Sequence, residues 1–297
     1  MLNESQPVYF YNKIVEQRRM RSLDFSELPV RGMAGEQMAA ESTQHILVTV
    51  ERGLQTVTFN RPHKKNAMTR QMYAALERTL REGAAREDVL VTALTGTGDY
   101  FSSGNDLSAA LNASGDPRMS AHEACLPVRR LVEALIDHPK LLVAVVNGPA
   151  VGIAATLLGL CDAVYASDQA TFSTPFTRLG LIAEACSSYT FPRIMGHLQA
   201  MEMLCFNKRL DAHEARRCGL VSEVLSQASL AEVWPRLHQM TALPRQSVLA
   251  TKRLVRQHCR AALHEACRLE YAELQERIQS EECAAALVRF MTERSKL

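Results

Sequence analysis

The amino-acid sequence predicts an α/β fold in which pairs of strands alternate with helices, followed by a C-terminal region made of helices alone. Two observations support this prediction. Short apolar runs typical of strands recur between residues 46 and 173, with amphipathic helical stretches between them. After about Leu220 the apolar residues follow helical spacing almost without interruption. A chain of 297 residues is long enough to bury a substantial core.

The strands and helices can be placed from local patterns. Glu51-Arg52-Gly53 separates the first two strands as a hairpin turn, and the hydroxyl of Thr69 is suited to cap the first helix. The expected strands are 46–50, 54–59, 89–94, 141–146, 163–166 and 170–173. The expected helices are the stretch after Thr69 and residues 122–136, then 230–240, 246–261, 263–278 and 282–293.

Composition excludes several classes of function. The chain is 47% hydrophobic and 22% charged, which is typical of a globular protein, and its formal charge of +2 is too small to indicate nucleic-acid binding. No apolar run reaches the roughly 18 residues that a membrane-spanning helix needs, so we expect no membrane insertion. The eight cysteines form no Cys-x-x-Cys pair and are expected to be reduced, and the nine histidines show no metal-ligand spacing, so no metal site is expected.

Two glycine-containing loops follow apolar strands. Residues 147–156 (NGPAVGIAAT) come directly after the strand 141–146, and residues 100–107 (YFSSGNDL) follow the strand 89–94 and a glycine turn. A strand, a tight turn and a helix start leave backbone N–H groups that can hold a phosphate or the oxyanion of a reacting carbonyl. For residues 147–156 alone, an ordinary strand-to-helix turn is the alternative.

These loops, together with further motifs in the same order, resemble the crotonase superfamily of enoyl-CoA hydratases and isomerases. The resemblance extends from about His45 to the C-terminus. It is strongest to the peroxisomal Δ3,Δ2-enoyl-CoA isomerases, through residues 179–192 (LGLIAEACSSYTFP) and the terminal tripeptide Ser295-Lys296-Leu297. The supporting motifs are Phe59-Asn60-Arg61-Pro62, Asn66-Ala67, 102–107, 147–162 and Thr174-Pro175-Phe176.

The resemblance implies a crotonase-like spiral of ββα units over residues 45–228. The C-terminal helical region, residues 229–297, would then pack across a trimer interface, giving a homotrimer or a hexamer. A helical cap over the chain's own core is the alternative for these helices. Residues 1–44 are expected to be an N-terminal extension or linker.

The resemblance also implies the catalytic residues. Glu184 would be the single base that shuttles a proton, and the backbone N–H groups of Asn105 and Ile153 would form the oxyanion hole. Glu184 stands in an apolar run, so its pKa should be raised. A carboxylate that interacts with the dipole of the following helix is the alternative reading of Glu184.

Two departures from the family pattern bear on the activity. The positions of the two glutamates that activate water in enoyl-CoA hydratases are occupied by Thr156 and Phe176, which disfavours hydration. The Pro-Glu-Gly of close relatives reads Ala183-Glu184-Ala185 here. Because alanine is less permissive than glycine, this change leaves activity and chain-length preference open.

Coenzyme A binding is expected around the glycine-containing loop of residues 100–107. By resemblance, the loop Ser102, Ser103, Gly104, Asn105 and Asp106 would line the adenine and pantetheine path. Lys64 and Lys65 could contact the phosphates, and a solvated basic turn is the alternative; Lys252 and Arg253 could add positive charge. No cofactor is expected, since coenzyme A belongs to the substrate.

The predicted function is isomerisation of 3-cis- or 3-trans-enoyl-CoA to 2-trans-enoyl-CoA in β-oxidation of unsaturated fatty acids. Alternatives are a dienoyl-CoA isomerase, or a CoA-ester-binding module without catalysis like the crotonase-like domains of chromodomain Y-type proteins. Ser295-Lys296-Leu297 is a peroxisomal address, so we expect a matrix enzyme with the import receptor as a partner. Residues 1–44 leave a secondary mitochondrial pool open.

Overall fold

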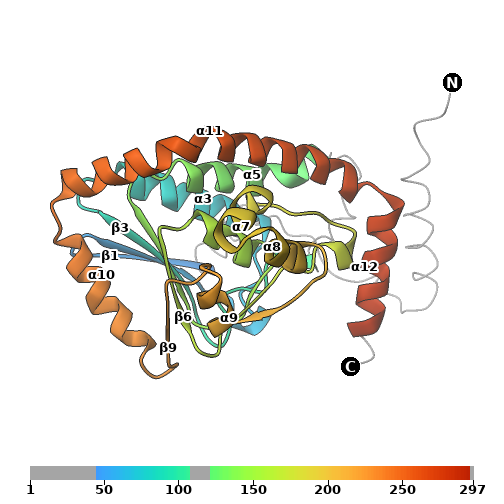
Figure 1. Cartoon of the computed structure of the whole chain (residues 1–297), viewed down its shortest axis with the longest axis horizontal. Coiled ribbons are helices and arrows are strands. Elements are labelled where there is room, and N and C mark those ends of the chain that lie inside the picture. Colours follow the sequence, from blue (N-terminus) through green and yellow to red (C-terminus); the bar gives the residue numbers. More distant parts are fainter. Residues whose placement is uncertain (1–44, 108–120, 295–297) are drawn as a thin grey trace, which may run out of the picture.

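The computed structural model describes residues 45–107 and 121–294 (Figure 1). Its main sheet has the strand order β1-β2-β3-β4-β6-β9, in which β1 and β2 are antiparallel and every later pair is parallel. A small sheet has the order β5-β7-β8. The main strands are β1 (Ile46–Glu51), β2 (Leu54–Phe59), β3 (Val91–Gly96), β4 (Leu141–Val146), β6 (Ala163–Ser167) and β9 (Glu223–Leu225). The small sheet contains β5 (Ala150–Val151), β7 (Thr171–Ser173) and β8 (Leu210–Asp211).

Helices follow or separate these strands. The α-helices are α3 (Arg70–Ala85), α5 (Ala121–Ile136), α6 (Ile153–Thr156), α7 (Ser187–Met195), α8 (His197–Leu204), α9 (Ala212–Arg217), α10 (Val233–Thr241), α11 (Arg245–Ile278) and α12 (Glu281–Arg294). Short 3-10 helices are η1 (Pro62–Lys64), η3 (Leu157–Leu160), η4 (Thr177–Leu179) and η5 (Leu230–Glu232). The α/β class and the helical C-terminal region predicted from the sequence are confirmed.

The main sheet is covered on both faces. Successive side chains of a strand point to opposite faces, so the fully apolar β4 serves two cores. Leu142, Ala144 and Val146 belong to the large core with α3 and α5. Val143 and Val145 belong to a smaller core with α10. Figure 1 shows α11 running over α5 and α3, with α10 on the other side of the sheet.

Several predicted elements are confirmed. The strands 54–59 and 141–146 match β2 and β4, and the Thr69 hydroxyl accepts a hydrogen bond from the Met72 N–H, as an N-cap does. The two helices expected at 246–261 and 263–278 are wrong as separate elements, because they form the single helix α11. Residues 258–266 contain no proline or glycine to interrupt the helix.

Helix α11 closes the core of its own chain. It packs along α5 and against α7, and it buries Leu263, Cys267 and Tyr271. The C-terminal helices thus act as a cap over the chain's own core, and the trimer interface stays a prediction. Residues 1–44 and the terminal tripeptide lie outside the described residues. No helix in the described parts of the chain is long and apolar enough to cross a membrane.

An ion pair between the buried Lys252 and the more exposed Asp162 fastens α11 to the main sheet. The Lys252 ammonium lies 2.6 Å from the Asp162 carboxylate and also donates to the Lys140 carbonyl. The same Asp162 oxygen accepts the Leu142 N–H at 2.7 Å, at the start of β4. Lys252 is therefore occupied inside the protein, and the suggestion that it adds charge for coenzyme A is wrong.

We expect Asp162→Ala to lower the free energy of unfolding by about 1–3 kcal/mol, since the buried Lys252 ammonium then keeps only the Lys140 carbonyl as an acceptor. Glu265→Ala on the same helix is the matched control, because Glu265 and Arg268 form an exposed pair, and such pairs contribute about 0–1 kcal/mol. Urea denaturation of both variants measures the difference. Equal losses of unfolding free energy in the two variants would show that the ion pair of Asp162 and Lys252 does not anchor α11.

Candidate active site

The two glycine-containing loops predicted from the sequence lie side by side and pair through their backbones. The Ser102 N–H donates to the Pro149 carbonyl at 3.2 Å, and the Val151 N–H donates to the Ser102 carbonyl at 3.0 Å. The buried Ser102 hydroxyl donates to the Asn66 carbonyl at 2.8 Å and accepts the Gly104 N–H at 3.1 Å. The loop after β3 is therefore fixed to the loop after β4.

Gly104 is required where these loops meet. Its φ of +82° lies in the left-handed region that favours glycine. A Cβ at this position would lie 2.5 Å from the Val151 carbonyl oxygen, which is far inside van der Waals contact. The glycine thus allows the close backbone approach that holds Asn105 beside the second loop.

This pairing leaves the two predicted oxyanion donors unused. Met68 bonds to the residues on either side of Asn105, donating to the Gly104 carbonyl at 2.8 Å and accepting the Asp106 N–H at 3.0 Å. Ile153 is the first residue of α6, where an N–H has no acceptor within the helix. Within the described residues, neither the Asn105 N–H nor the Ile153 N–H donates to another backbone group.

Other residues predicted to bind coenzyme A build the loop. The Asp106 carboxylate forms an ion pair with Arg61 at 2.5 Å, and the same guanidinium nitrogen donates to the Ala67 carbonyl at 3.1 Å. Asp106 and Ser102 are both buried. Their side chains therefore hold the loop in shape, and what the loop offers a ligand is its backbone.

The two predicted phosphate-contacting lysines lie on the surface beside this loop. The Lys65 carbonyl accepts the Ser103 N–H at 2.9 Å, and this hydrogen bond joins the turn of Lys64 and Lys65 to the loop of residues 102–106. The Lys65 ammonium lies 5.0 Å from the centroid of the Tyr100 ring, within range of a cation–π contact. Lys64 and Lys65 are both exposed.

Glu184 lies in the turn that leads into α7 and is half-buried. Burial, and then the negative charge of Glu270, raise the pKa of its carboxyl to about 8. Among the described residues no hydrogen-bond donor contacts this carboxylate, so nothing there offsets its desolvation. A carboxyl group with such a pKa can both take and return a proton near neutral pH.

The charges of Glu184 and Asp106 act on the same buried tyrosine. The pKa of the Tyr73 hydroxyl, on α3, is raised well above its ordinary value by burial and then by the charges of Glu184 and Asp106. Burial and the Glu184 charge likewise raise the pKa of Tyr271 well above its ordinary value and that of Cys125 to about 11. The charge of Glu184 therefore reaches titratable side chains on α3, α5 and α11.

Sequence reasoning did not identify Tyr73, Cys125, Glu270 or Tyr271. Each is buried on the core-facing side of a helix. Their polar atoms within otherwise apolar helix faces are the signal that could have marked them, but that signal does not tell which residue they approach.

The two positions that correspond to the hydratase glutamates hold no carboxylate. Thr156 is buried in α6, where its hydroxyl donates to the Ile153 carbonyl at 3.3 Å. Phe176 is buried beside Gly152, with a ring carbon 3.7 Å from where a Cβ of residue 152 would lie. Both side chains pack around the loop of Ile153 and cannot activate water.

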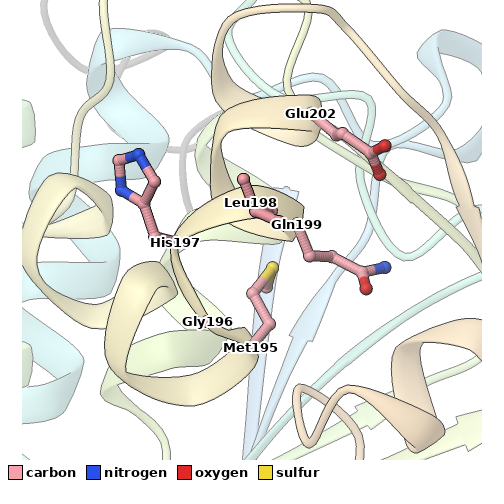
Figure 2. A pocket seen from close by; sticks show the side chains of 6 residues that line it. All are labelled: Met195, Gly196, His197, Leu198, Gln199 and Glu202. Carbon is pink, nitrogen blue, oxygen red and sulfur yellow. The ribbon is translucent and has the colours of Figure 1, made fainter.

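A surface hollow of about 430 Å³ lies elsewhere, at the junction of α7 and α8 (Figure 2). Residues between Met195 and Glu202 line it, and none of the predicted site residues does. In residues 45–107 and 121–294, no group of three or more His, Cys, Asp or Glu side chains is placed to hold a metal ion.

Comparison with known proteins agrees with this geometry. The family model described as enoyl-CoA hydratase/isomerase matches residues 49–296. The chain is 48% identical to rat enoyl-CoA delta isomerase 2 over 92% of its length and 70% of that protein. It is 46% identical to mouse peroxisomal enoyl-CoA delta isomerase 3, over 91% of this chain and 86% of that protein.

Solved structures share the fold. A crystal structure of an enoyl-CoA hydratase/isomerase from Pseudoalteromonas atlantica T6c aligns with a TM-score of 0.77 at 34% identity, covering 84% of this chain and 97% of that one. The family-model match extends over most of the sequence. It includes the two paired loops and Glu184. The chain belongs to the enoyl-CoA hydratase/isomerase family.

Proposed function

We propose that the protein is a Δ3,Δ2-enoyl-CoA isomerase in which Glu184 is the base. The observations that support this most strongly are a half-buried carboxyl with a pKa of about 8 and a loop pair in which, among the described residues, two backbone N–H groups donate to no other backbone group. Relatives named enoyl-CoA delta isomerases are 46–48% identical to this chain over 91–92% of its length. Acyl-CoA thioesters are therefore the substrate class.

The reaction needs a base and an oxyanion hole. Glu184 takes a proton from C2 of the 3-enoyl thioester, and the C–H electrons move into a dienolate. The dienolate oxygen accepts hydrogen bonds from the backbone N–H groups of Asn105 and Ile153. The protonated Glu184 then gives the proton to C4. The double bond becomes C2=C3, the carbonyl reforms, and the carboxylate is restored without any cofactor.

Hydration is disfavoured for this chain. A hydratase must orient and deprotonate a water molecule, and Thr156 and Phe176 at the corresponding positions carry no carboxylate. A single shuttling carboxyl is sufficient for double-bond transfer. A dienoyl-CoA isomerase would call on additional acidic residues, and a CoA-ester-binding module would have no need of a base with a raised pKa.

We propose a peroxisomal matrix enzyme that is imported through the terminal Ser295-Lys296-Leu297 and assembles as a homotrimer or hexamer. The mouse relative is named peroxisomal, which supports this location. The exposed lysines Lys64 and Lys65 lie beside the oxyanion loop and are suited to contact the phosphates of coenzyme A.

Glu184→Gln should lower kcat by about 10²–10⁴-fold, the usual contribution of a general base, while CoA-ester binding stays nearly intact. A coupled assay with 3-trans-hexenoyl-CoA and longer 3-enoyl-CoAs measures turnover. Glu265→Gln, which changes an exposed glutamate on α11, is the control and should keep wild-type activity. Retention of most activity in Glu184→Gln would refute the assignment of the base.

The pH dependence follows from the same group. Glu184 must be ionised to accept the C2 proton, so log kcat/KM should rise with pH up to about 8 and then level. Below that pH it should fall about tenfold for each pH unit, because the ionised fraction falls by that factor. Initial rates at constant ionic strength test this, and a midpoint at the ordinary pKa of glutamate would contradict it.

Gly104→Ala should lower kcat by roughly 10²–10³-fold, because the added methyl pushes the loop of Asn105 away from Val151 and misplaces one oxyanion donor. Gly196→Ala is the matched control. Gly196 also has a positive φ, +80°, but a Cβ there would meet nothing within 4 Å. Comparable loss of kcat in both variants would mean that backbone strain, and not the loop contact, is responsible.

A further inference from the structure

A buried glutamate from α11 holds the start of α7. One Glu270 oxygen accepts the Cys186 N–H at 2.7 Å, and the other accepts the Ser188 N–H at 2.9 Å and the Ser188 hydroxyl at 2.5 Å. Glu270 is 84 residues away from Cys186 in sequence and is 5% exposed. Its charge lies at the N-terminus of α7, where the helix dipole favours an anion.

These contacts fix the turn of residues 184–188, which carries the base. Ala185 and Cys186 have φ values of +54° and +61°, a left-handed conformation that is unfavourable for residues other than glycine. The Glu184 carbonyl accepts the Ser187 hydroxyl at 2.7 Å and the Ser187 N–H at 3.2 Å. The direction of Glu184 therefore depends on the conformation that Glu270 stabilises from the other side.

Glu270 is also the charged neighbour of the base. The charge of Glu184 acts on Tyr73 on α3, Cys125 on α5 and Tyr271 on α11, and the raised pKa of each keeps it protonated at neutral pH. Burial raises the pKa of Glu270 as well, but its hydrogen bonds with Ser188 and Cys186 lower it and favour the ionised form. The negative charge of Glu270 in turn raises the pKa of Glu184.

We propose that Glu270 is a positioning residue for the reaction: it holds the left-handed turn that aims Glu184, and it supplies the negative charge beside that base. The inference rests on the proposed role of Glu184. It assigns distinct tasks to the buried Glu270 and the half-buried Glu184. Glu270 accepts hydrogen bonds, which favour its ionised form against the effect of burial, and Glu184 exchanges the proton.

Glu270→Gln tests both tasks, because it keeps the shape, removes the charge and turns an amide donor toward N–H or O–H donors. We expect kcat to fall roughly 10–100-fold with KM changed little, as for a misaimed catalytic group. We expect the midpoint of the pH profile of kcat/KM to move to lower pH, because ionisation of Glu184 no longer meets a negative neighbour. Hydrogen exchange of the amides in 184–191 should become faster.

Ser188→Ala and Glu265→Gln complete the experiment. Ser188→Ala removes one hydrogen bond and keeps the Glu270 charge, so it should reduce kcat less and not lower the midpoint. Glu265→Gln, on the exposed side of α11, should match wild type. Wild-type kcat or an unmoved midpoint in Glu270→Gln would overturn the proposal.

The outcomes separate this proposal from the proposed function. If the wild-type protein failed to isomerise 3-enoyl-CoA, the proposed function would be wrong. Faster amide exchange in Glu270→Gln would still support the conclusion that Glu270 stabilises the turn of residues 184–188. If wild type were active and Glu184→Gln inactive, while Glu270→Gln kept its midpoint and its amide protection, only the role of Glu270 would be wrong.

Discussion

The backbone pairing between the loop after β3 and the loop after β4 is the interaction on which the site depends. Because β3 and β4 are neighbouring parallel strands, both loops leave the sheet at the same edge. The pairing uses the N–H groups of Ser102 and Val151 and leaves those of Asn105 and Ile153 unused. A shift of one residue in this register would present different N–H groups, so the sheet register determines which donors are available.

Burial determines the pKa of the Glu184 carboxyl. A carboxylate taken out of water without donors is unfavourable, and the rise of the Glu184 pKa to about 8 reflects this. Glu270 is more deeply buried but accepts three hydrogen bonds at the start of a helix. Two carboxyl groups in one region thus have different surroundings, which is how a fold separates an acid that exchanges protons from one that stays charged.

The sequence predicted what local patterns determine. β2, β4 and the Thr69 cap follow from apolar runs and a hydroxyl at a helix start, and the glycine loops lie together because their strands are adjacent. It did not predict that Lys252 pairs with Asp162 or that Glu270 reaches Cys186, 84 residues away. A charged residue on a long helix is usually solvated, and helical spacing does not specify which partner a buried one meets.

The alanine at position 185 can now be understood. The resemblance to the isomerases implies glycine at this position, and the φ of +54° is one that glycine adopts without strain. Alanine in this conformation costs about 1–2 kcal/mol, whereas a hydrogen bond to a charged group contributes about 1.5–3 kcal/mol. The hydrogen bonds of Glu270 on the following residues are sufficient to offset the strain. Ala185 therefore occupies a left-handed conformation that glycine adopts without strain, and the hydrogen bonds of Glu270 offset the cost of that conformation.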